Sequence, residues 1–118
     1  MSPTIKSSDR IGELKIGIAA ARFNSHITNS MFDRCHKRLQ DLGVAKDNIT
    51  VARVPGSFEL PYAIKSLIVN NDLNAAIALG AVIKGQTSHF LFISQAVSQG
   101  LSTVAIETSV PVIFGVLT

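Results

Sequence analysis

The sequence predicts an α/β fold in which helices cover both faces of a four-stranded parallel sheet. Four short apolar runs that suit β-strands occur at residues 16–21, 49–54, 75–83 and 112–117. Mainly apolar runs of this length are typical of strands buried on both faces, as in parallel sheets. Because right-handed crossovers place the intervening helices on two faces, we expect a three-layer α/β/α sandwich.

The segments between these strands have the apolar spacing of helices. Residues recur three and four positions apart, and the expected core faces are Met31, Cys35, Leu39 and Leu42; Leu60, Ala63, Ile64, Leu67 and Ile68; and Ile93, Ala96, Val97, Gly100, Leu101 and Val104. Gly43 is a stop signal for the first helix, and Ser57 is the expected N-cap of the second. The predicted order is β-α-β-α-β-α-β.

A length of 118 residues fits one domain, since a hydrophobic core of this size serves about 100 to 150 residues. Residues 1–14 are polar and rich in turn formers, so we expect an N-terminal arm with at most one short strand near residues 11–14. The domain is then expected to occupy residues 15–118.

The composition favours an assembly of subunits. Charged residues make up 16% of the chain, against roughly a quarter in typical soluble domains, and the mean hydropathy is +0.33. So few charges leave part of the surface poorly solvated, which favours its burial against other subunits.

The charge pattern argues against nucleic acid and membranes as partners. The net charge is +3, but the local basic cluster of Arg34, Lys37 and Arg38 lies on a predicted helix and is interpreted as a solvated face. No apolar run approaches the roughly 18 to 20 residues of a membrane span. The single cysteine, Cys35, excludes an internal disulfide and a zinc site with several cysteines, and it fits a reducing compartment such as the cytoplasm.

Polar and aromatic residues follow the predicted strands where a ligand site is expected. In an open parallel sheet the carboxyl ends of the strands share one edge, and ligands bind in the crevice there. The three segments that follow strands are 22–24, 55–59 and 84–89, and Phe114 lies within the fourth strand. The sequence therefore predicts a ligand site at this edge.

The segment 85–89 predicts a strand-to-helix turn that can hold an anion. Gly85 allows close approach of the backbone, and the free N–H groups of the turn act with the hydroxyls of Thr87 and Ser88. Taken alone, either hydroxyl is more simply interpreted as a helix N-cap. His89 falls in the first helical turn, where the helix dipole favours a neutral imidazole that can accept a proton; a structural histidine at a helix start is an equally good interpretation.

The other residues of this edge each allow two interpretations. Phe23 can stack on a planar ligand or fill a gap in the core. Glu59 can accept hydrogen bonds from a ligand or stabilise a helix start. Arg22 is better explained by a surface ion pair than by ligand binding, and His26 and His36 are interpreted as surface residues without ligand spacing.

Four blocks of the sequence together resemble the 6,7-dimethyl-8-ribityllumazine synthase family of riboflavin biosynthesis. They are KIGIAAARFN, VPGSFELP, LGAVIKGQTSHF and VPVIFGVLT, in the order and spacing of that family, and the resemblance covers residues 15–118. It implies a flavodoxin-like sandwich and the condensation of 5-amino-6-(D-ribitylamino)uracil with 3,4-dihydroxy-2-butanone 4-phosphate, without a metal or organic cofactor. It also implies a homo-oligomer, either a pentamer or an icosahedral shell of sixty subunits.

The resemblance also implies roles for individual residues. Phe23 would stack on the pyrimidine, Ser57, Phe58 and Glu59 would hold the ribityl chain, and the backbone of Ala81, Val82 and Ile83 would bind the uracil edge. Gln86 and Thr87 would bind phosphate, His89 would transfer protons, and Phe114 would close the pocket from a neighbouring subunit.

Two further interpretations remain open at this point. Archaeal-type riboflavin synthase resembles the same family, although a phosphate-binding turn does not suit its substrate. A non-catalytic flavin- or lumazine-binding shell protein is the other. The resemblance also implies helices after the last strand that carry an arginine and a lysine of the phosphate site, so we expect the domain at 15–118 to be short at its C-terminal end.

Overall fold

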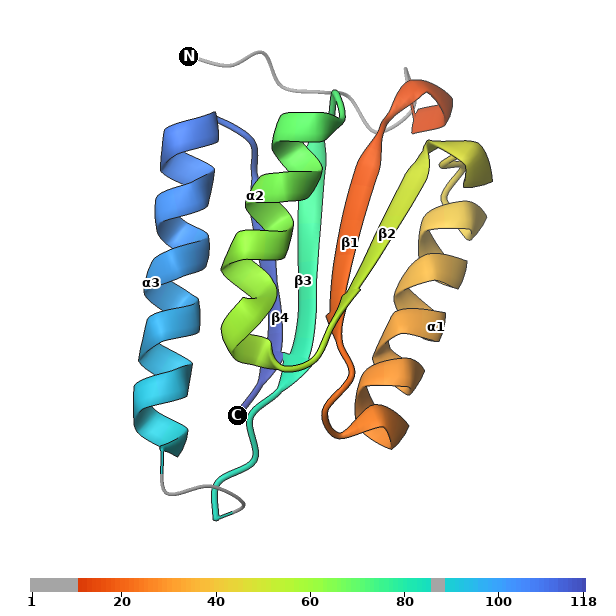
Figure 1. Cartoon of the computed structure of the whole chain (residues 1–118). Coiled ribbons are helices and arrows are strands. Elements are labelled where there is room, and N and C mark those ends of the chain that lie inside the picture. The colour runs from red at the N-terminus through yellow and green to blue at the C-terminus, as the bar shows by residue number, and fades with distance from the viewer. Residues whose placement is uncertain (1–10, 86–88) are drawn as a thin grey trace.

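The computed structural model describes residues 11–85 and 89–118, in which a four-stranded sheet lies between helices (Figure 1). The strands are β1 (Ile16–Ala21), β2 (Ile49–Val54), β3 (Ala75–Ala81) and β4 (Val112–Leu117), and the α-helices are α1 (Ser25–Asp41), α2 (Leu60–Asn70) and α3 (Phe90–Thr108). Three short 3-10 turns are η1 (Ile11–Glu13), η2 (Lys46–Asn48) and η3 (Ser57–Glu59). The predicted order of strands and helices is confirmed.

All strand pairs are parallel, and the order across the sheet is β2-β1-β3-β4. This is the order of the first four strands in flavodoxin-like sheets. Ile16 of β1 pairs with Ile49 on one side and Ala75 on the other. The predicted flavodoxin-like α/β/α sandwich is confirmed, and the point where the strand order reverses lies between β1 and β3.

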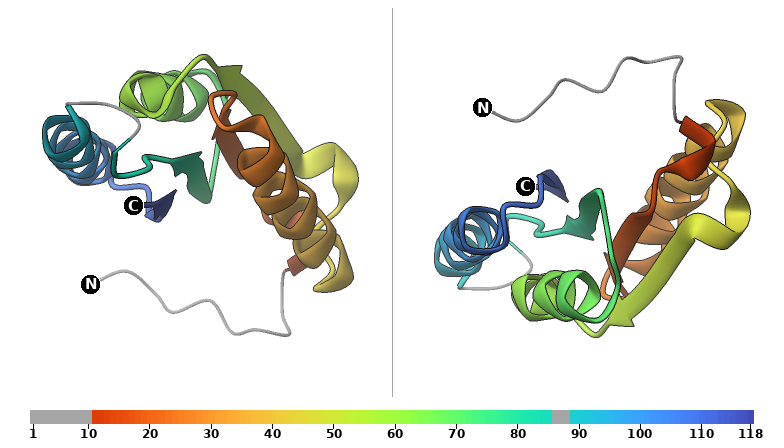
Figure 2. Two further views of the ribbon diagram at one scale, coloured as in Figure 1. Left: turned by 90° about the horizontal axis from the view of Figure 1, so that it is seen from below. Right: turned by 90° about the horizontal axis from the view of Figure 1, so that it is seen from above.

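The helices form two outer layers (Figure 2). Helices α2 and α3 pack on one face of the sheet, where the larger core cluster includes Ile64, Leu67, Val97 and Leu101. Helix α1 packs on the other face, over a smaller cluster built around Ile18, Ala20 and Leu79. Because β1 is covered on both sides, all six of its residues are buried, as the sequence predicted.

Burial of the two edge strands differs from the prediction. The sequence predicted four strands buried on both faces, but in this chain β2 and β4 are only partly buried. Ile113 and Leu117 of β4 are 49% and 51% exposed, because they share a sheet face with Ile77 and α1 lies over β1 and β3 rather than over β4. Apolar composition alone does not distinguish a strand covered by its own chain from one left partly open.

Smaller differences concern the ends of elements and one helix face. The strand considered near residues 11–14 is instead the 3-10 turn η1, and β3 ends at Ala81 rather than Ile83. Leu42 follows the end of α1 and is 48% exposed, while Phe32, which the predicted face omitted, packs against the α1-side core. No helix within the described residues is long and apolar enough to cross a membrane.

Helices α2 and α3 pack closely against each other at Gly100 and Pro61. A Cβ on Gly100 of α3 would lie 2.7 Å from Cγ of Pro61 in α2, which is too close for a side chain. Pro61 is in the first turn of α2, where proline needs no N–H partner. Both helices begin at the carboxyl edge of the sheet (Figure 1).

Candidate functional site

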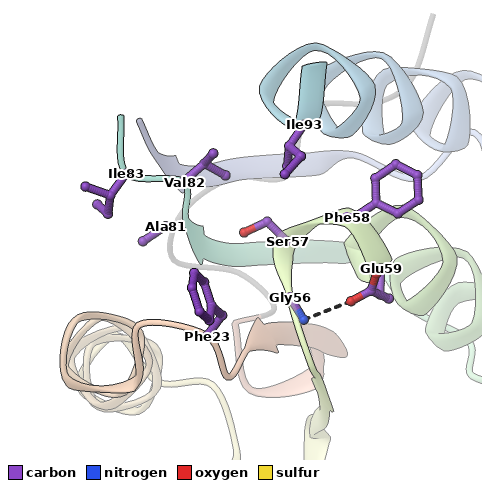
Figure 3. A pocket seen from close by; sticks show the side chains of 9 residues that line it. All are labelled: Phe23, Gly56, Ser57, Phe58, Glu59, Ala81, Val82, Ile83 and Ile93. Atoms are coloured by element: carbon purple, nitrogen blue, oxygen red, sulfur yellow. Dashed lines mark hydrogen bonds between the residues drawn. The ribbon is translucent and has the colours of Figure 1, made fainter. Parts of the chain in front are cut away.

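A cavity of about 170 Å³ opens at the carboxyl edge of the sheet (Figure 3). The described residues that line it come from the ends of β1, β2 and β3 and from α3: Phe23, Gly56, Ser57, Phe58, Glu59, Ala81, Val82, Ile83 and Ile93. It lies beside the β1 and β3 ends, which is where ligands bind in sheets of this order. The predicted position of the site at this edge therefore coincides with a cavity.

Phe23 is held at the cavity by its backbone. Its N–H donates to the carbonyl of Pro55 at 2.9 Å, and the N–H of Arg22 donates to Val54 at 2.7 Å, so the hydrogen bonding between β1 and β2 continues past both strands. The Phe23 side chain is 60% exposed and projects toward Ala81 in Figure 3. An exposed ring does not fill the core, which favours a surface for a planar ligand. Arg22 is exposed, and the ion pair expected for it is not found among the described residues of this chain.

The turn η3 forms the opposite wall of the cavity. Oε1 of Glu59 accepts a hydrogen bond from the N–H of Gly56 at 2.9 Å, which closes the turn just before α2. The Glu59 carboxylate thus has the helix-start role considered from the sequence, and its second oxygen makes no hydrogen bond within the described residues. Phe58 is exposed beside it.

Ser57 does not act as the predicted N-cap of α2. Its residue is 6% exposed, and its Oγ is buried without a hydrogen-bond partner among the described residues. The N-cap position of α2 falls on Glu59, because η3 comes between Ser57 and the helix. In Figure 3 the Ser57 side chain projects from η3 toward the end of β3.

The end of β3 forms the floor of the cavity. Ala81 and Val82 are buried, and the N–H of Val82 donates to the carbonyl of Leu117 at 2.7 Å. The carbonyl of Ala81 accepts a 3.5 Å hydrogen bond from Nδ2 of Asn24. Because alanine and valine have no polar side-chain atoms, the polar groups on the floor of the cavity belong to the backbone.

His89 lies at the N-cap position of α3, and this helix begins at the same edge of the sheet as the cavity (Figure 1). Its carbonyl accepts a hydrogen bond from the N–H of Ile93 at 2.9 Å, and Ile93 lines the cavity one helical turn further on. His89 is exposed and is not among the lining residues. Gly85, with φ of 94°, has the left-handed backbone expected of a tight turn. Gln86, Thr87 and Ser88 lie outside the described residues.

Phe114 lies apart from the cavity of its own chain. It pairs with Ala78 in the middle of β4, is 47% exposed and does not line the cavity. Its predicted contribution from a neighbouring subunit stays a prediction.

Sequence reasoning named most of the lining residues and missed two. Gly56 lies in a segment that the prediction included, but without a role of its own, and Ile93 was assigned to the core face of its helix. No signal in the sequence separates an Ile at the open end of a helix stripe from one in the core. A backbone turn such as that at Gly56 could be found only through its Pro-Gly pair.

The described residues contain no cluster of three or more His, Cys, Asp or Glu that could hold a metal ion. Cys35 is half-buried on the inner side of α1, and burial raises the pKa of its thiol. His26 is exposed on α1, as predicted, while the ring of His36 is partly covered and lies 5.4 Å from that of Phe32.

The fold and the cavity define a flavodoxin-like α/β protein with an aromatic-walled cavity at the carboxyl edge of its sheet. The chain matches the family described as 6,7-dimethyl-8-ribityllumazine synthase over residues 13–118. It belongs to that family. The match covers nearly all of the described residues, including every residue that lines the cavity.

Curated relatives carry the same description. Proteins described as 6,7-dimethyl-8-ribityllumazine synthase from Lactiplantibacillus plantarum and Neisseria meningitidis are 44% and 45% identical over 105 residues, and one from Porphyromonas gingivalis is 45% identical over 106. These alignments cover 89%, 89% and 90% of this chain and 66% of each relative. The chain therefore spans just under two thirds of the length of these relatives.

Proposed function

We propose that the protein condenses 5-amino-6-(D-ribitylamino)uracil with 3,4-dihydroxy-2-butanone 4-phosphate to give 6,7-dimethyl-8-ribityllumazine, phosphate and water, the penultimate step of riboflavin biosynthesis. Family membership and the names of the relatives support this reaction. The observation that carries the proposal is the cavity, because an exposed aromatic ring, a closed polar turn and a backbone edge surround one space. These features suit a flat heterocycle with a polyol substituent.

The pyrimidine half would occupy the cavity between Phe23 and the end of β3. The Phe23 ring would stack on the pyrimidine, and the backbone groups of Ala81, Val82 and Ile83 would bind the uracil edge. Ser57, Phe58 and Glu59 would hold the ribityl chain. The Glu59 carboxylate is already fixed by the Gly56 N–H, so a second acceptor oxygen is positioned for a hydroxyl group.

The reaction requires proton transfers at a fixed place. The amine attacks the ketone, and loss of water gives an imine; a proton is then lost next to it, phosphate leaves, and the ring closes with loss of a second water. His89 would carry these protons from the start of α3, one turn before the cavity residue Ile93. Gln86 and Thr87 would bind the phosphate.

The site is proposed to be shared between copies of the chain, in the cytoplasm. Its volume of about 170 Å³ is below the roughly 300 to 1,000 Å³ of typical ligand pockets, and the reaction brings two substrates together. Large apolar side chains are exposed on α2 and α3, and they are Tyr62, Val69, Leu91, Phe92 and Ile106. Burying these in a homo-oligomer, a pentamer or a sixty-subunit shell, would cover them and bring Phe114 to a neighbouring cavity.

The test is a two-substrate assay that follows the absorbance of the lumazine product and the release of phosphate, which we expect in equal amounts. Incubation with lumazine alone serves as the control, since riboflavin formed there would identify a riboflavin synthase instead. Tight flavin or lumazine binding without product from the two substrates would contradict the enzymatic proposal. The mass in solution, from light scattering, separates a pentamer from a shell, and a monomer would contradict the shared site.

A further inference from the structure

Asn24 stands at the N-cap of α1 but does not cap the helix. Asparagine at this position normally has an extended backbone, and its side chain accepts a hydrogen bond from the first helical turn. Here φ is 61° and ψ is 50°, which is the left-handed region, and the side chain makes no capping bond. A residue that forgoes this interaction in a sparsely populated conformation indicates a role for the side chain elsewhere.

The Asn24 side chain instead reaches the end of β3. Its Nδ2 donates to the carbonyl of Ala81 at 3.5 Å, across 57 positions of the sequence. The backbone pairing of β1 with β3 ends at Ala20 and Leu79. The carboxamide therefore links the two strand ends just beyond the last backbone pair, at the place where the strand order reverses.

The backbone of Asn24 is held from its other side by α1. Its carbonyl accepts hydrogen bonds from the N–H groups of Ile27 and Thr28, both at 3.0 Å. It also accepts one from Oγ1 of Thr28 at 3.3 Å, and Thr28 is fully buried. Asn24 is thus held between the first turn of α1, through its carbonyl, and the floor of the cavity, through its side chain.

This arrangement decides where the Phe23 ring lies. The ring is mostly exposed, so core packing does not hold it, and its place depends on the backbone on either side. The N–H of Phe23 ties that backbone to the turn after β2, and the next side chain ties it to β3. The dipeptide Phe23–Asn24 thereby connects the end of β1 with the turn after β2 and with the end of β3.

We propose that Asn24 is a positioning residue that sets the separation between the Phe23 ring and the backbone edge at Ala81, Val82 and Ile83. A planar ligand that stacks on the ring and hydrogen-bonds to that edge requires both surfaces at a fixed spacing. The inference rests on the proposed function, in which that ligand is the ribitylaminopyrimidine. Asn24 acts through its neighbours and is not a catalytic residue.

The decisive variant is Asn24→Gly, because glycine adopts the left-handed conformation without strain and lacks the side chain that carries the carboxamide. Asn24→Asp keeps the size but replaces the N–H donor by a carboxylate facing the Ala81 carbonyl. Ser109→Gly is the matched control, since Ser109 is the other non-glycine residue described with positive φ and lies at the far end of α3. The dissociation constant for the ribitylaminopyrimidine is measured by calorimetry, and kcat and KM are measured for both substrates.

We expect Asn24→Gly to weaken binding of the pyrimidine about tenfold and to raise its KM equally. Asn24→Asp should weaken binding at least as much, whereas kcat at saturation and the KM of the phosphate ketone should stay within about twofold. Ser109→Gly should match the parent protein. If Asn24→Gly bound the pyrimidine as tightly as the parent protein, the proposal would be overturned. The carboxamide would then contribute nothing to the affinity beyond what the backbone conformation contributes.

A second measurement does not depend on the substrate. Hydrogen exchange of the Phe23 N–H, which is bonded to Pro55, should be about tenfold faster in Asn24→Gly than in the parent protein and unchanged in Ser109→Gly. Unchanged exchange in Asn24→Gly would overturn the anchoring of Phe23. If exchange were faster in Asn24→Gly but the parent protein bound no pyrimidine, the anchoring of Phe23 would be supported and the proposed function contradicted. The failure of the inference and the failure of the proposed function can therefore be distinguished.

Discussion

The hydroxyl of Ser57 occupies the space that a side chain on Gly80 would need. A Cβ on Gly80 would lie 2.5 Å from Oγ of Ser57 and 3.1 Å from Cδ1 of Leu60. Gly80 belongs to β3 and Ser57 to the turn after β2, so the cavity wall η3 rests directly on the sheet beneath it. This contact explains a glycine inside a buried strand, where glycine is otherwise unfavourable.

Gly80→Ala should destabilise the protein by about 1 to 3 kcal/mol, the usual cost of an added methyl group in a packed interior. The free energy of unfolding from urea titration measures it. The Ser57→Ala background is the control: removal of Oγ should lower the cost of Gly80→Ala, leaving mainly the contact with Leu60. Equal costs in both backgrounds would show that Ser57 is not the obstacle.

Ser57→Ala alone should leave the free energy of unfolding unchanged or raise it by about 1 kcal/mol. The mutation deletes a buried hydroxyl that has no partner among the described residues, and an unpartnered buried group opposes folding. The same urea titration measures the effect. Destabilisation by more than about 1 kcal/mol would mean that the hydroxyl is hydrogen-bonded in the folded protein.

Phe23→Ala should weaken binding of the pyrimidine by about 1 to 3 kcal/mol, which is the range measured when aromatic stacking on a base is removed. Its effect on stability should be under about 1 kcal/mol, because the side chain is mostly exposed. Calorimetric titration and urea unfolding measure the two quantities. Leu42→Ala is a matched control, since Leu42 is similarly exposed but does not line the cavity. Equal affinity of Phe23→Ala and the parent protein would rule out stacking.

His89→Ala should slow product formation by about 10²- to 10⁴-fold without abolishing it, since positioned proton transfer contributes a factor of that size. Holding the two substrates together contributes separately and survives the mutation. Steady-state kinetics measure the loss, with His26→Ala as a control at an exposed histidine of α1. A folded variant that binds the pyrimidine normally but has no detectable turnover would contradict this division.

Burial raises the pKa of the Cys35 thiol, which gives a prediction for pH. At pH 8 its reaction with a disulfide reagent should be slower than that of a free cysteine, because less thiolate is present. The folded state disfavours the thiolate, so the contribution of the neutral thiol to the free energy of unfolding is complete at pH values below the pKa of Cys35 in the unfolded protein. This contribution decreases as the pH rises from there through the higher pKa of the folded protein. Cys35 is the single cysteine, so the thiol reaction reports on it alone, and Cys35→Ser is the blank. Labelling as fast as that of free cysteine would contradict the burial.

The order of strands and helices, and the edge of the sheet that carries the cavity, could be predicted from the sequence alone. Three strands have the predicted bounds, because continuous apolar runs between turn-forming residues specify strands locally. The position of Phe23, Ser57 and Ala81 at one edge followed as well, since parallel strands end on the same side. These conclusions required only the spacing of residue types.

Which strands are central and which contacts hold the cavity can be seen only in the folded chain. The order β2-β1-β3-β4 leaves β2 and β4 at the edges, although all four runs are mainly apolar, because burial depends on the neighbours that a strand acquires in space. In the sequence Asn24 has no role beyond its place after the first strand, and Ser57 looks like an ordinary helix cap. Their side chains meet Ala81 and Gly80, residues far away in the chain, and no local pattern of residues records such long-range contacts.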